Sequence, residues 1–413
     1  MSISLSQLDQ VEVPEIATTI RNAGVSGAGG AGFPTYAKWE RLDEVDHLLV
    51  NHQESEPNYY IDKWLGQERA DRFAELFDAL LDSAFETVVV TPKHKDRVWN
   101  RELETATDAT VYMPEDLPID ADEESGVVFA YTEDRYEYGM ESVVLRIVAS
   151  VTMGGDELPM DYGWIVQNTE TLWDIYRTFV DGEPVTRKYI HVDGNVPEHR
   201  FLEVPIGTPA SRLLEAAGAS VDDLSKDEML LDGGPGWCFP IEAPPADFGV
   251  TKRTNCLTVL DADAVTKNTL GDGRVNVINS YDWEGNHETE PTRVDPDFVR
   301  ISMITNPLFE GVVERSQPIV GPGDYVEEGE MIATPAPNGI SNTHHASIDG
   351  EVIEVGETHI EILNESIGVA AKSSAEGEER GIYWTWCIEC GSYRTMPEPE
   401  HVEGTEYVCS DCR

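Results

Sequence analysis

Hydrophobic residues in the first half of the chain form short apolar runs separated by longer stretches of helical spacing. The predicted strands are residues 46–51, 86–91, 110–113, 126–131 and 164–168, and the predicted helices are 13–23, 62–84, a segment that begins near Ser142, and 169–179. The strand segments are short and apolar, whereas 62–84 repeats its aromatic residues and leucines at helical spacing. Because strand and helix alternate, the sequence predicts a mixed, largely parallel α/β layer.

The second half is richer in strands and turns. Residues 188–192 predict a strand, 201–231 predict strand, helix (210–218) and strand, and 298–362 are β-rich with glycine turn signals. The expected segments are an α/β domain (1–185), a small α+β module (186–262), a polar connector (263–297), an all-β domain (298–363), a charged linker (364–381) and a cysteine-containing end (382–413).

Acidic residues outnumber basic ones along the whole chain. The 413 residues include 78 Asp and Glu against 29 Lys and Arg, a formal net charge of −49. A nucleic-acid partner is not expected, because such proteins carry a basic stripe and none is visible here. The acid is interleaved with ordinary apolar segments, so we interpret it as the surface of a protein from a halophilic archaeon, solvated by carboxylates in concentrated salt.

Membrane insertion and export are not expected either. The best apolar run, 142–153, is shorter than the roughly 20 residues of a membrane-spanning helix and contains Arg146. The N-terminus lacks the basic-then-apolar pattern of a secretory signal. Four of the six cysteines form two pairs at metal-binding spacing, which favours a reducing compartment, so we expect a cytoplasmic protein.

The most distinctive motif is the run 24–32, which holds five glycines in nine residues and is followed by Phe33-Pro34-Thr35 and Lys38. Glycines at this density allow positive φ angles and bring several backbone N–H groups close to an anion, and a lysine adds positive charge. The run therefore predicts a phosphate cradle. A flexible glycine-rich turn is the alternative from this segment alone.

This motif resembles the flavin-binding loop of the NADH-oxidising subunit of respiratory complex I and of its relative in the Rnf electron-transport complex, RnfC. Four further stretches resemble the same family in the same order: 54–57 (Glu-Ser-Glu-Pro), 138–141 (Tyr-Gly-Met-Glu), 166–171 (Val-Gln-Asn-Thr-Glu-Thr) and 233–235 (Gly-Gly-Pro). The resemblance implies a Rossmann-like flavin domain that binds FMN and NADH.

The resemblance also assigns roles to single residues. It implies that Gly27, Gly29, Gly30, Gly32, Phe33, Lys38, Asn51, Glu54, Asn168 and Thr171 bind the cofactor, and that Glu56 and Glu141 lie at the reacting nucleotide. From the residues themselves, the acidic run 54–57 is equally typical of a solvated turn. Likewise, Glu141 could be a first-turn acid on a helix and Asn168 an N-cap. Where the family usually has an aspartate, this chain has Gln53.

The later segments resemble parts of the same relatives. Residues 186–262 are similar to their ubiquitin-like (SLBB) ligand-binding module, and 298–363 to a lipoyl-like barrel-sandwich domain without a carrier lysine. The domain order resembles that of the cobalamin-reductase subunit of propanediol utilisation. No Cys-x2-Cys-x2-Cys run occurs in the sequence, so no iron–sulfur cluster of that kind is expected. The single thiols Cys238 and Cys256 stand among apolar neighbours and are expected to be buried.

The C-terminal end carries a separate motif. Cys387 and Cys390 precede Cys409 and Cys412 by an eighteen-residue loop, which is the spacing of a four-thiolate metal site. This predicts a zinc ribbon, and a rubredoxin-like iron would use the same four ligands.

The sequence thus favours an NADH dehydrogenase-like flavoprotein that accepts hydride from NADH and passes electrons to a partner protein. Two other hypotheses remain open. One is a non-catalytic binding or assembly module that keeps the fold, and the other is a cobalamin-reductase-like flavoprotein.

Overall fold

The computed structural model describes residues 4–221, 224–225, 227–283, 287–306 and 311–364, together with the backbone of 382–387 and 392–397. Its first layer is a five-stranded sheet of order β3-β4-β2-β1-β5 in which all neighbours are parallel. The strands are β1 (His47–His52), β2 (Thr87–Pro92), β3 (Thr110–Tyr112), β4 (Gly126–Ala130) and β5 (Trp164–Asn168). This sheet confirms the predicted parallel α/β layer.

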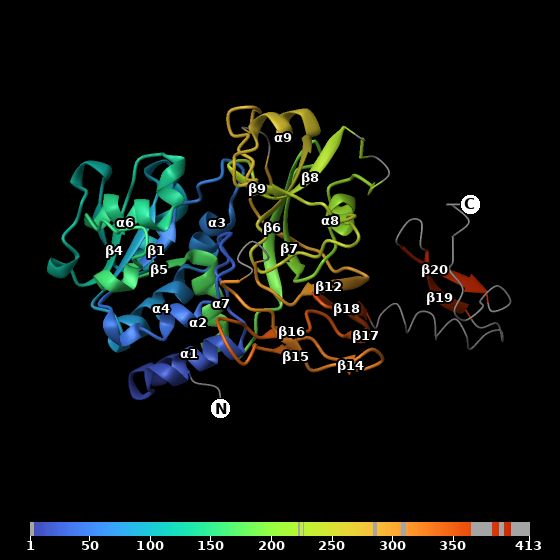
Figure 1. Ribbon diagram of the computed structural model, residues 1–413. Coiled ribbons are helices and arrows are strands. Elements are labelled where there is room, and N and C mark those ends of the chain that lie inside the picture. Colours follow the sequence, from blue (N-terminus) through green and yellow to red (C-terminus); the bar gives the residue numbers. More distant parts are fainter. Residues whose placement is uncertain are drawn as a thin grey trace.

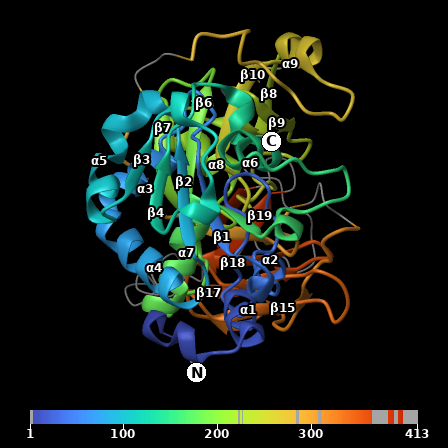
Figure 2. The ribbon, with the colours of Figure 1, turned by 90° about the vertical axis from the view of Figure 1, so that its left-hand side faces the viewer.

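Seven α-helices in the described part of this layer accompany the sheet: α1 (Val13–Asn22), α2 (Tyr36–Trp39), α3 (Ile61–Glu68), α4 (Ala70–Ser83), α5 (Arg97–Ala106), α6 (Glu141–Ala149) and α7 (Thr169–Val180). Leu48 and Val50 of β1 join one hydrophobic core with α4 and α7, whereas Leu49 between them joins a second core with α6. This alternation follows the two-residue period of a strand. Figure 2 shows α3, α4 and α5 on one side of the strands and α6 on the other.

The segment 62–84, predicted as one helix, forms two. The break is at Arg69, whose backbone (φ −120°, ψ 20°) ends α3 before α4 begins. The Arg69 guanidinium lies 5.1 Å from the ring centre of Trp64 and 5.5 Å from that of Trp173, a cation–π arrangement that holds the corner. Helical spacing continues across this corner, so the pattern alone did not reveal it.

A six-stranded mixed sheet of order β11-β7-β6-β10-β8-β9 follows, shown in Figure 1 above the β-sandwich. Its elements are β6 (Arg187–Gly194), β7 (Arg200–Pro205), α8 (Ala210–Ala216), β8 (Glu228–Gly234), β9 (Trp237–Pro240), β10 (Cys256–Asp261), α9 (Ala262–Asn268) and β11 (Thr292–Arg293). The predicted order of strand, helix and strand over 201–231 is confirmed. Strand β6 pairs antiparallel with β7 and parallel with β10.

The segment expected to be a polar connector, 263–297, is built into this second sheet. Strand β11 pairs in parallel with β7. Val265, Val275, Val277 and Trp283 are buried in a small core with residues of β8, β9 and β10. These four apolar residues are widely spaced among polar ones, which hid them from periodicity.

The last described domain contains two small antiparallel sheets, of order β12-β18-β17-β14 and β13-β15-β16. The strands are β12 (Phe298–Ser302), β13 (Gln317–Pro318), β14 (Tyr325–Val326), β15 (Met331–Thr334), β16 (His344–His345), β17 (Gly350–Val355) and β18 (His359–Asn364). Buried residues of these strands, including Val299, Ile332 and Ile362, belong to the same core cluster as α1 and α4. The β-rich prediction for 298–362 is therefore confirmed.

The thiols divide into two groups. Cys238 and Cys256 are fully buried, as expected. At the C-terminal end, β19 (Ile382–Cys387) pairs antiparallel with β20 (Ser392–Pro397). The Cys387 side chain and the whole of Cys390, Cys409 and Cys412 lie outside the described residues, so the four-cysteine metal site stays a prediction. None of the helices described in the structure has the length and apolar character needed to cross a membrane.

We expect the free energy of unfolding to rise steeply with salt. A net charge of −49 repels itself in the folded state, and raising KCl from about 0.1 M to about 1 M shortens the Debye length from roughly 10 Å to roughly 3 Å. Urea unfolding at both concentrations measures the change. NaCl should act like KCl. An unfolding midpoint independent of both salts would contradict the halophilic interpretation.

Candidate functional site

A cavity of about 630 Å³ lies where the carboxyl ends of β1 and β5 face the six-stranded sheet. Parallel α/β sheets commonly bind ligands at this edge. The α/β layer contributes the glycine run, the segment 51–62 and the turn 136–140, and the second sheet contributes residues of β8, β9 and the segment before β10. The volume lies within the usual range of cofactor pockets, roughly 300–1,000 Å³.

The glycine run enters the cavity as a tight loop with its own internal bonds. Gly27 N–H donates to the Phe33 carbonyl, and Gly32 N–H to the Gly27 carbonyl, each at 2.8 Å. Ala28 N–H donates to the Thr171 hydroxyl on α7 at 2.9 Å. These bonds fix the two ends of the loop.

The residues at the tip, Gly29, Gly30 and Ala31, line the cavity. Their three N–H groups donate to no partner in the part of the chain that the structure describes. Gly30 has φ of 99°, a left-handed conformation that favours glycine. Successive N–H groups in such a turn form a concave donor array that suits an anionic oxygen group.

Side chains from distant segments hold this tip in place. Arg253 is buried, donates from Nη1 to the Gly30 carbonyl at 3.3 Å, and donates from Nη2 to Asp232 Oδ2 at 2.6 Å. Asn306 Nδ2 donates to the Ala31 carbonyl at 2.7 Å. Arg253 therefore brings a permanent positive charge to the loop, at a cavity whose other charged lining residues are acidic.

Three buried carboxyl groups line the opposite part of the cavity. Burial raises the pKa of Glu54 to about 7 and that of Glu56 to about 7, because desolvation disfavours the charged form. Burial also raises the pKa of Asp62 well above its usual range, and the neighbouring Glu54 adds to this shift. Near neutral pH these groups can therefore hold or release protons within the cavity.

Specific partners orient these carboxyl groups. Glu56 accepts from the Tyr136 hydroxyl at 2.7 Å and from Gly236 N–H at 2.8 Å, and so links the α/β layer to the turn between β8 and β9. Glu54 accepts from Lys63 N–H at 3.1 Å. Its φ of 39° is unusual for a residue with a side chain, and such backbone strain is typical of functional sites.

Aromatic side chains complete the lining. Tyr59, Tyr136, Trp237 and Phe239 all face the cavity, and Trp237 is 43% exposed. Three buried polar atoms of lining residues have no hydrogen-bond partner among the described residues: Ser55 Oγ, Asp232 Oδ1 and Asn255 Oδ1. All three can accept hydrogen bonds, so a ligand that carries N–H or hydroxyl groups would satisfy them.

Half of the residues assigned from the sequence come together at this cavity: Gly29, Gly30, Asn51, Glu54, Glu56 and Asn168. Asn51 Nδ2 donates to the Gly139 carbonyl at 2.8 Å. Asn168 is the N-cap of α7, because its Oδ1 accepts from Glu170 N–H at 3.0 Å. Its Nδ2 donates to both oxygens of Asp62, at 2.9 and 3.1 Å.

The other assigned residues lie outside the lining. Gly27, Gly32 and Phe33 shape the two ends of the loop, and Thr171 anchors it. Lys38 and Glu141 form an ion pair at 2.9 Å, and the Lys38 ammonium also donates to the Val166 carbonyl at 3.0 Å. Glu141 is the first residue of α6, as the helix-start alternative proposed.

Sequence reasoning missed the contribution of the second sheet. Arg253, Asp232, Asn255, Trp237 and Phe239 all line the cavity. The segment 251–256 was noted for its family resemblance, and its adjacent Lys252-Arg253 pair is rare in so acidic a chain. That scarcity was the available signal for a buried cation.

Comparisons with known proteins agree with this geometry. Residues 20–177 match a family model described as the Nuo51 FMN-binding domain. The RnfC-type component of the ion-translocating oxidoreductase complex of Vibrio cholerae is 29% identical over 243 residues, which cover 58% of this chain and 29% of that protein. Cobalamin reductase PduS of Salmonella typhimurium is 30% identical over 266 residues, covering 63% of this chain and 53% of that protein.

The chain therefore spans between about a third and a half of the length of these relatives. A crystal structure of an NAD+-reducing NiFe hydrogenase aligns with a TM-score of 0.49 and 20% identity, covering 63% of this chain and 49% of the other.

The lining fits FMN by its donor set. The three N–H groups of the loop tip and Arg253 suit a phosphate, the aromatic side chains suit a flat ring, and the unpaired acceptors suit ribityl hydroxyls and a ring N–H. Gly234 leaves necessary room, because a Cβ there would lie 2.7 Å from Glu56 Cγ.

We predict that Glu56→Gln flattens the pH dependence of stability. The folded-state pKa of about 7 lies above the ordinary value of 4.5, so Glu56 favours the folded state at low pH, and this contribution is lost as pH rises from about 4.5 through 7. The loss amounts to at most about 3 kcal/mol. Urea unfolding at pH 5 and pH 8 measures it.

The matched control is Glu115→Gln, which changes an exposed glutamate. It should keep the wild-type pH slope. Equal slopes for wild type and Glu56→Gln would contradict the assigned burial of the Glu56 carboxyl group.

Proposed function

We propose that this chain, whose relatives support an RnfC-like family that includes the flavin subunit of complex I, is an FMN-dependent oxidoreductase subunit. In this proposal it accepts hydride from NADH and passes electrons to a partner protein. The observation that carries it is the loop tip, where the free N–H groups of Gly29, Gly30 and Ala31 meet the buried Arg253 at an aromatic cavity.

The chain's residues would divide the binding of FMN between them. Gly29, Gly30, Ala31 and Arg253 would hold the phosphate, by N–H donation and by charge. Ser55 Oγ, Asp232 Oδ1 and Asn255 Oδ1 would accept from the ribityl hydroxyls and the ring N–H. Bound flavin supplies a two-electron acceptor for hydride, which no protein side chain provides.

The buried carboxyl groups would manage protons near that acceptor. Glu54 and Glu56 change charge near pH 7, so each can hold a proton at its carboxyl oxygen or release it without a large energetic cost. Tyr136 and Gly236 fix the Glu56 carboxyl group between the two sheets. Asn168, held by its cap bond to α7, keeps Asp62 oriented.

NADH would enter on the side of the turn 136–140. Gly139 and Met140 line the cavity, and Glu141 follows them at the start of α6. Gly139 is required there, because a Cβ would lie 2.1 Å from Ser55 Oγ. A carboxylate near the ribose hydroxyls favours NADH over NADPH, since it repels a 2′-phosphate, and Glu141 is the candidate.

The electron acceptor would be a partner protein. The sequence has no Cys-x2-Cys-x2-Cys run to carry electrons onward within the chain. The named relatives are a component of an ion-translocating oxidoreductase complex and a cobalamin reductase, so a protein complex or a corrinoid carrier is the acceptor class we propose.

Replacing Arg253 tests the phosphate assignment. We expect Arg253→Gln to weaken FMN binding by roughly 10- to 100-fold, the usual effect of losing a charged hydrogen bond. Quenching of flavin fluorescence on titration measures affinity. Riboflavin lacks the phosphate, so its affinity should change little.

Two control variants accompany this test. Arg253→Lys keeps the charge and should retain most of the FMN affinity, whereas Arg101→Gln changes an exposed arginine and should have no effect. Equal weakening for FMN and riboflavin would show that Arg253 acts on the fold and not on the phosphate.

Anaerobic addition of NADH to the FMN-loaded protein tests the hydride step. We expect the flavin absorbance near 450 nm to bleach, because hydride transfer delivers two electrons to the ring (band position about that of any oxidised flavin). NADPH should bleach it at least about tenfold more slowly, if Glu141 repels the 2′-phosphate.

The other outcomes are equally informative. Flavin that binds but is not bleached by either nucleotide would refute NADH as the donor. A protein that takes up no FMN would refute the enzyme and leave the non-catalytic binding module.

A further inference from the structure

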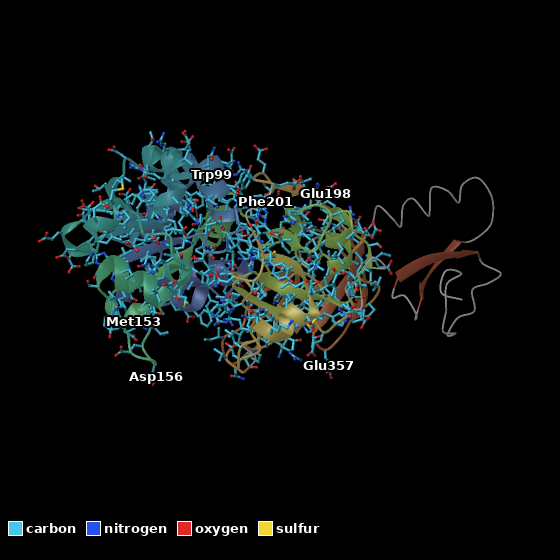
Figure 3. The ribbon with its side chains drawn as sticks, turned by 90° about the horizontal axis from the view of Figure 1, so that it is seen from above. Trp99, Met153, Asp156, Glu198, Phe201 and Glu357 are labelled. Atoms are coloured by element: carbon cyan, nitrogen blue, oxygen red, sulfur yellow. The ribbon has the colours of Figure 1, made fainter. Side chains whose placement is uncertain are left out.

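Three side chains that play no part in the flavin cavity meet at one end of the second sheet. Asp193 lies near the end of β6, His199 lies in the turn between β6 and β7, and His287 lies in the segment before β11. His199 Nδ1 is 3.2 Å from Asp193 Oδ1, and His287 Nδ1 is 3.6 Å from Asp193 Oδ2. Glu198 and Phe201, which flank His199 closely in the sequence, are labelled in Figure 3.

Asp193 is a built and buried anchor. It is only 1% exposed. Asn58 Nδ2 donates to its Oδ2 at 2.6 Å, and Gly194 N–H donates to its Oδ1 at 2.7 Å. These two bonds orient the carboxylate toward the histidines. A buried carboxylate requires compensating positive charge, because desolvation of an unpaired charge is costly.

The bond made by the other nitrogen of His287 sharpens this requirement. His287 Nε2 lies 2.7 Å from the Trp283 carbonyl oxygen. A carbonyl only accepts, so Nε2 carries the hydrogen. In the neutral ring Nδ1 then presents a lone pair to Asp193, and two lone-pair donors facing each other need a cation between them. A histidine whose second nitrogen donates to a carbonyl is the usual arrangement at a metal centre.

The separations fit one ion. Ligand atoms about 2.0–2.1 Å from a tetrahedral metal lie about 3.4 Å from one another, and the two measured separations, 3.2 and 3.6 Å, bracket that value. All three donor atoms lie within 4.8 Å of one another. The His199 and His287 rings are stacked with centres 5.2 Å apart, so both Nδ1 atoms can approach the same point.

We propose that Asp193, His199 and His287 bind a divalent transition-metal ion, with Zn²⁺ as the physiological class. Two imidazole nitrogens and one carboxylate oxygen are borderline ligands that suit zinc better than Mg²⁺ or Ca²⁺. His199 is 30% exposed, so a water or an added ligand completes the coordination from the solvent side.

The ion would fasten the segment before β11 to the second sheet. That segment is joined to the sheet by the two-residue strand β11 and by a bond from Phe201 N–H to Glu288 Oε2 at 3.0 Å. A metal shared by β6, the β6–β7 turn and His287 adds a cross-link between residues about ninety positions apart, which stabilises the fold.

A second cluster, Glu354, His359 and Glu361, does not qualify. Arg300 already pairs with Glu361, and its Nη2 lies 3.3 Å from His359 Nδ1, so a permanent cation occupies the position that a metal would take.

Metal analysis of the full chain tests the proposal. The protein is stripped with a chelator, incubated with ZnCl2, passed through gel filtration and analysed for zinc per chain. His199→Gln, a half-exposed position that tolerates change, and Asp193→Asn should each bind one equivalent less than wild type. His94→Gln, at an exposed histidine away from the cluster, should bind as much as wild type.

The four C-terminal cysteines are a separate zinc source, so the same comparison is made in a Cys409→Ser, Cys412→Ser background. There the remaining equivalent should disappear with His199→Gln. Zinc should also raise the melting temperature of this background but not of its His199→Gln derivative. Equal zinc content with and without His199, in variants whose circular dichroism matches wild type, would overturn the proposal.

Discussion

The glycine loop is held in one conformation by side chains from four separate parts of the chain, and the cavity depends on this. Thr171 of α7 accepts from Ala28 N–H, and Lys188 of β6 donates to the Ala28 carbonyl at 3.0 Å. Arg253 and Asn306 donate to the carbonyls of Gly30 and Ala31. With its carbonyls bound from outside, the loop tip can turn its N–H groups to a ligand. A loop so rich in glycine would otherwise sample many conformations, and these bonds offset the entropy cost of fixing it.

The same contacts place charge where the acidic composition would disfavour an anion. Lys188 pairs with Glu170 at 2.6 Å, and both side chains are almost completely buried. Glu170 also accepts from Tyr189 N–H at 3.1 Å, so the pair is bonded at both ends and ties α7 to β6. Because burial raises the pKa values of Glu54 and Glu56 to about 7, part of the cavity's acid is neutral near neutral pH. An anionic ligand therefore meets less repulsion here than the overall charge of −49 suggests.

Local patterns predicted the elements well, and contacts between distant segments escaped them. The parallel strands were readable because each is a short apolar run buried on both faces, as Leu48 and Leu49 illustrate. The corner at Arg69 was not readable, because helical spacing continues across it and only the stacking on Trp64 and Trp173 explains it. For the site, motif spacing found Gly30 and Glu56, which lie on the loop and at a strand end. It could not find Arg253, which reaches Gly30 across 223 positions.

The residues that line the cavity come from both sheets, so the cavity forms only when the two are in contact. The matched family domain, 20–177, supplies the loop tip, Glu54 and Glu56, whereas the cation, two of the three unpaired acceptors and the aromatic residues Trp237 and Phe239 come from beyond residue 177. Glu56 is bonded to Gly236 across this divide, and a Cβ on Gly234 would collide with it. Folding of the second sheet is therefore required to complete the donor set, to bury Glu56 and to shift its pKa. The proton chemistry of the site is in this sense a property of the contact between the two sheets, and neither sheet contains it alone.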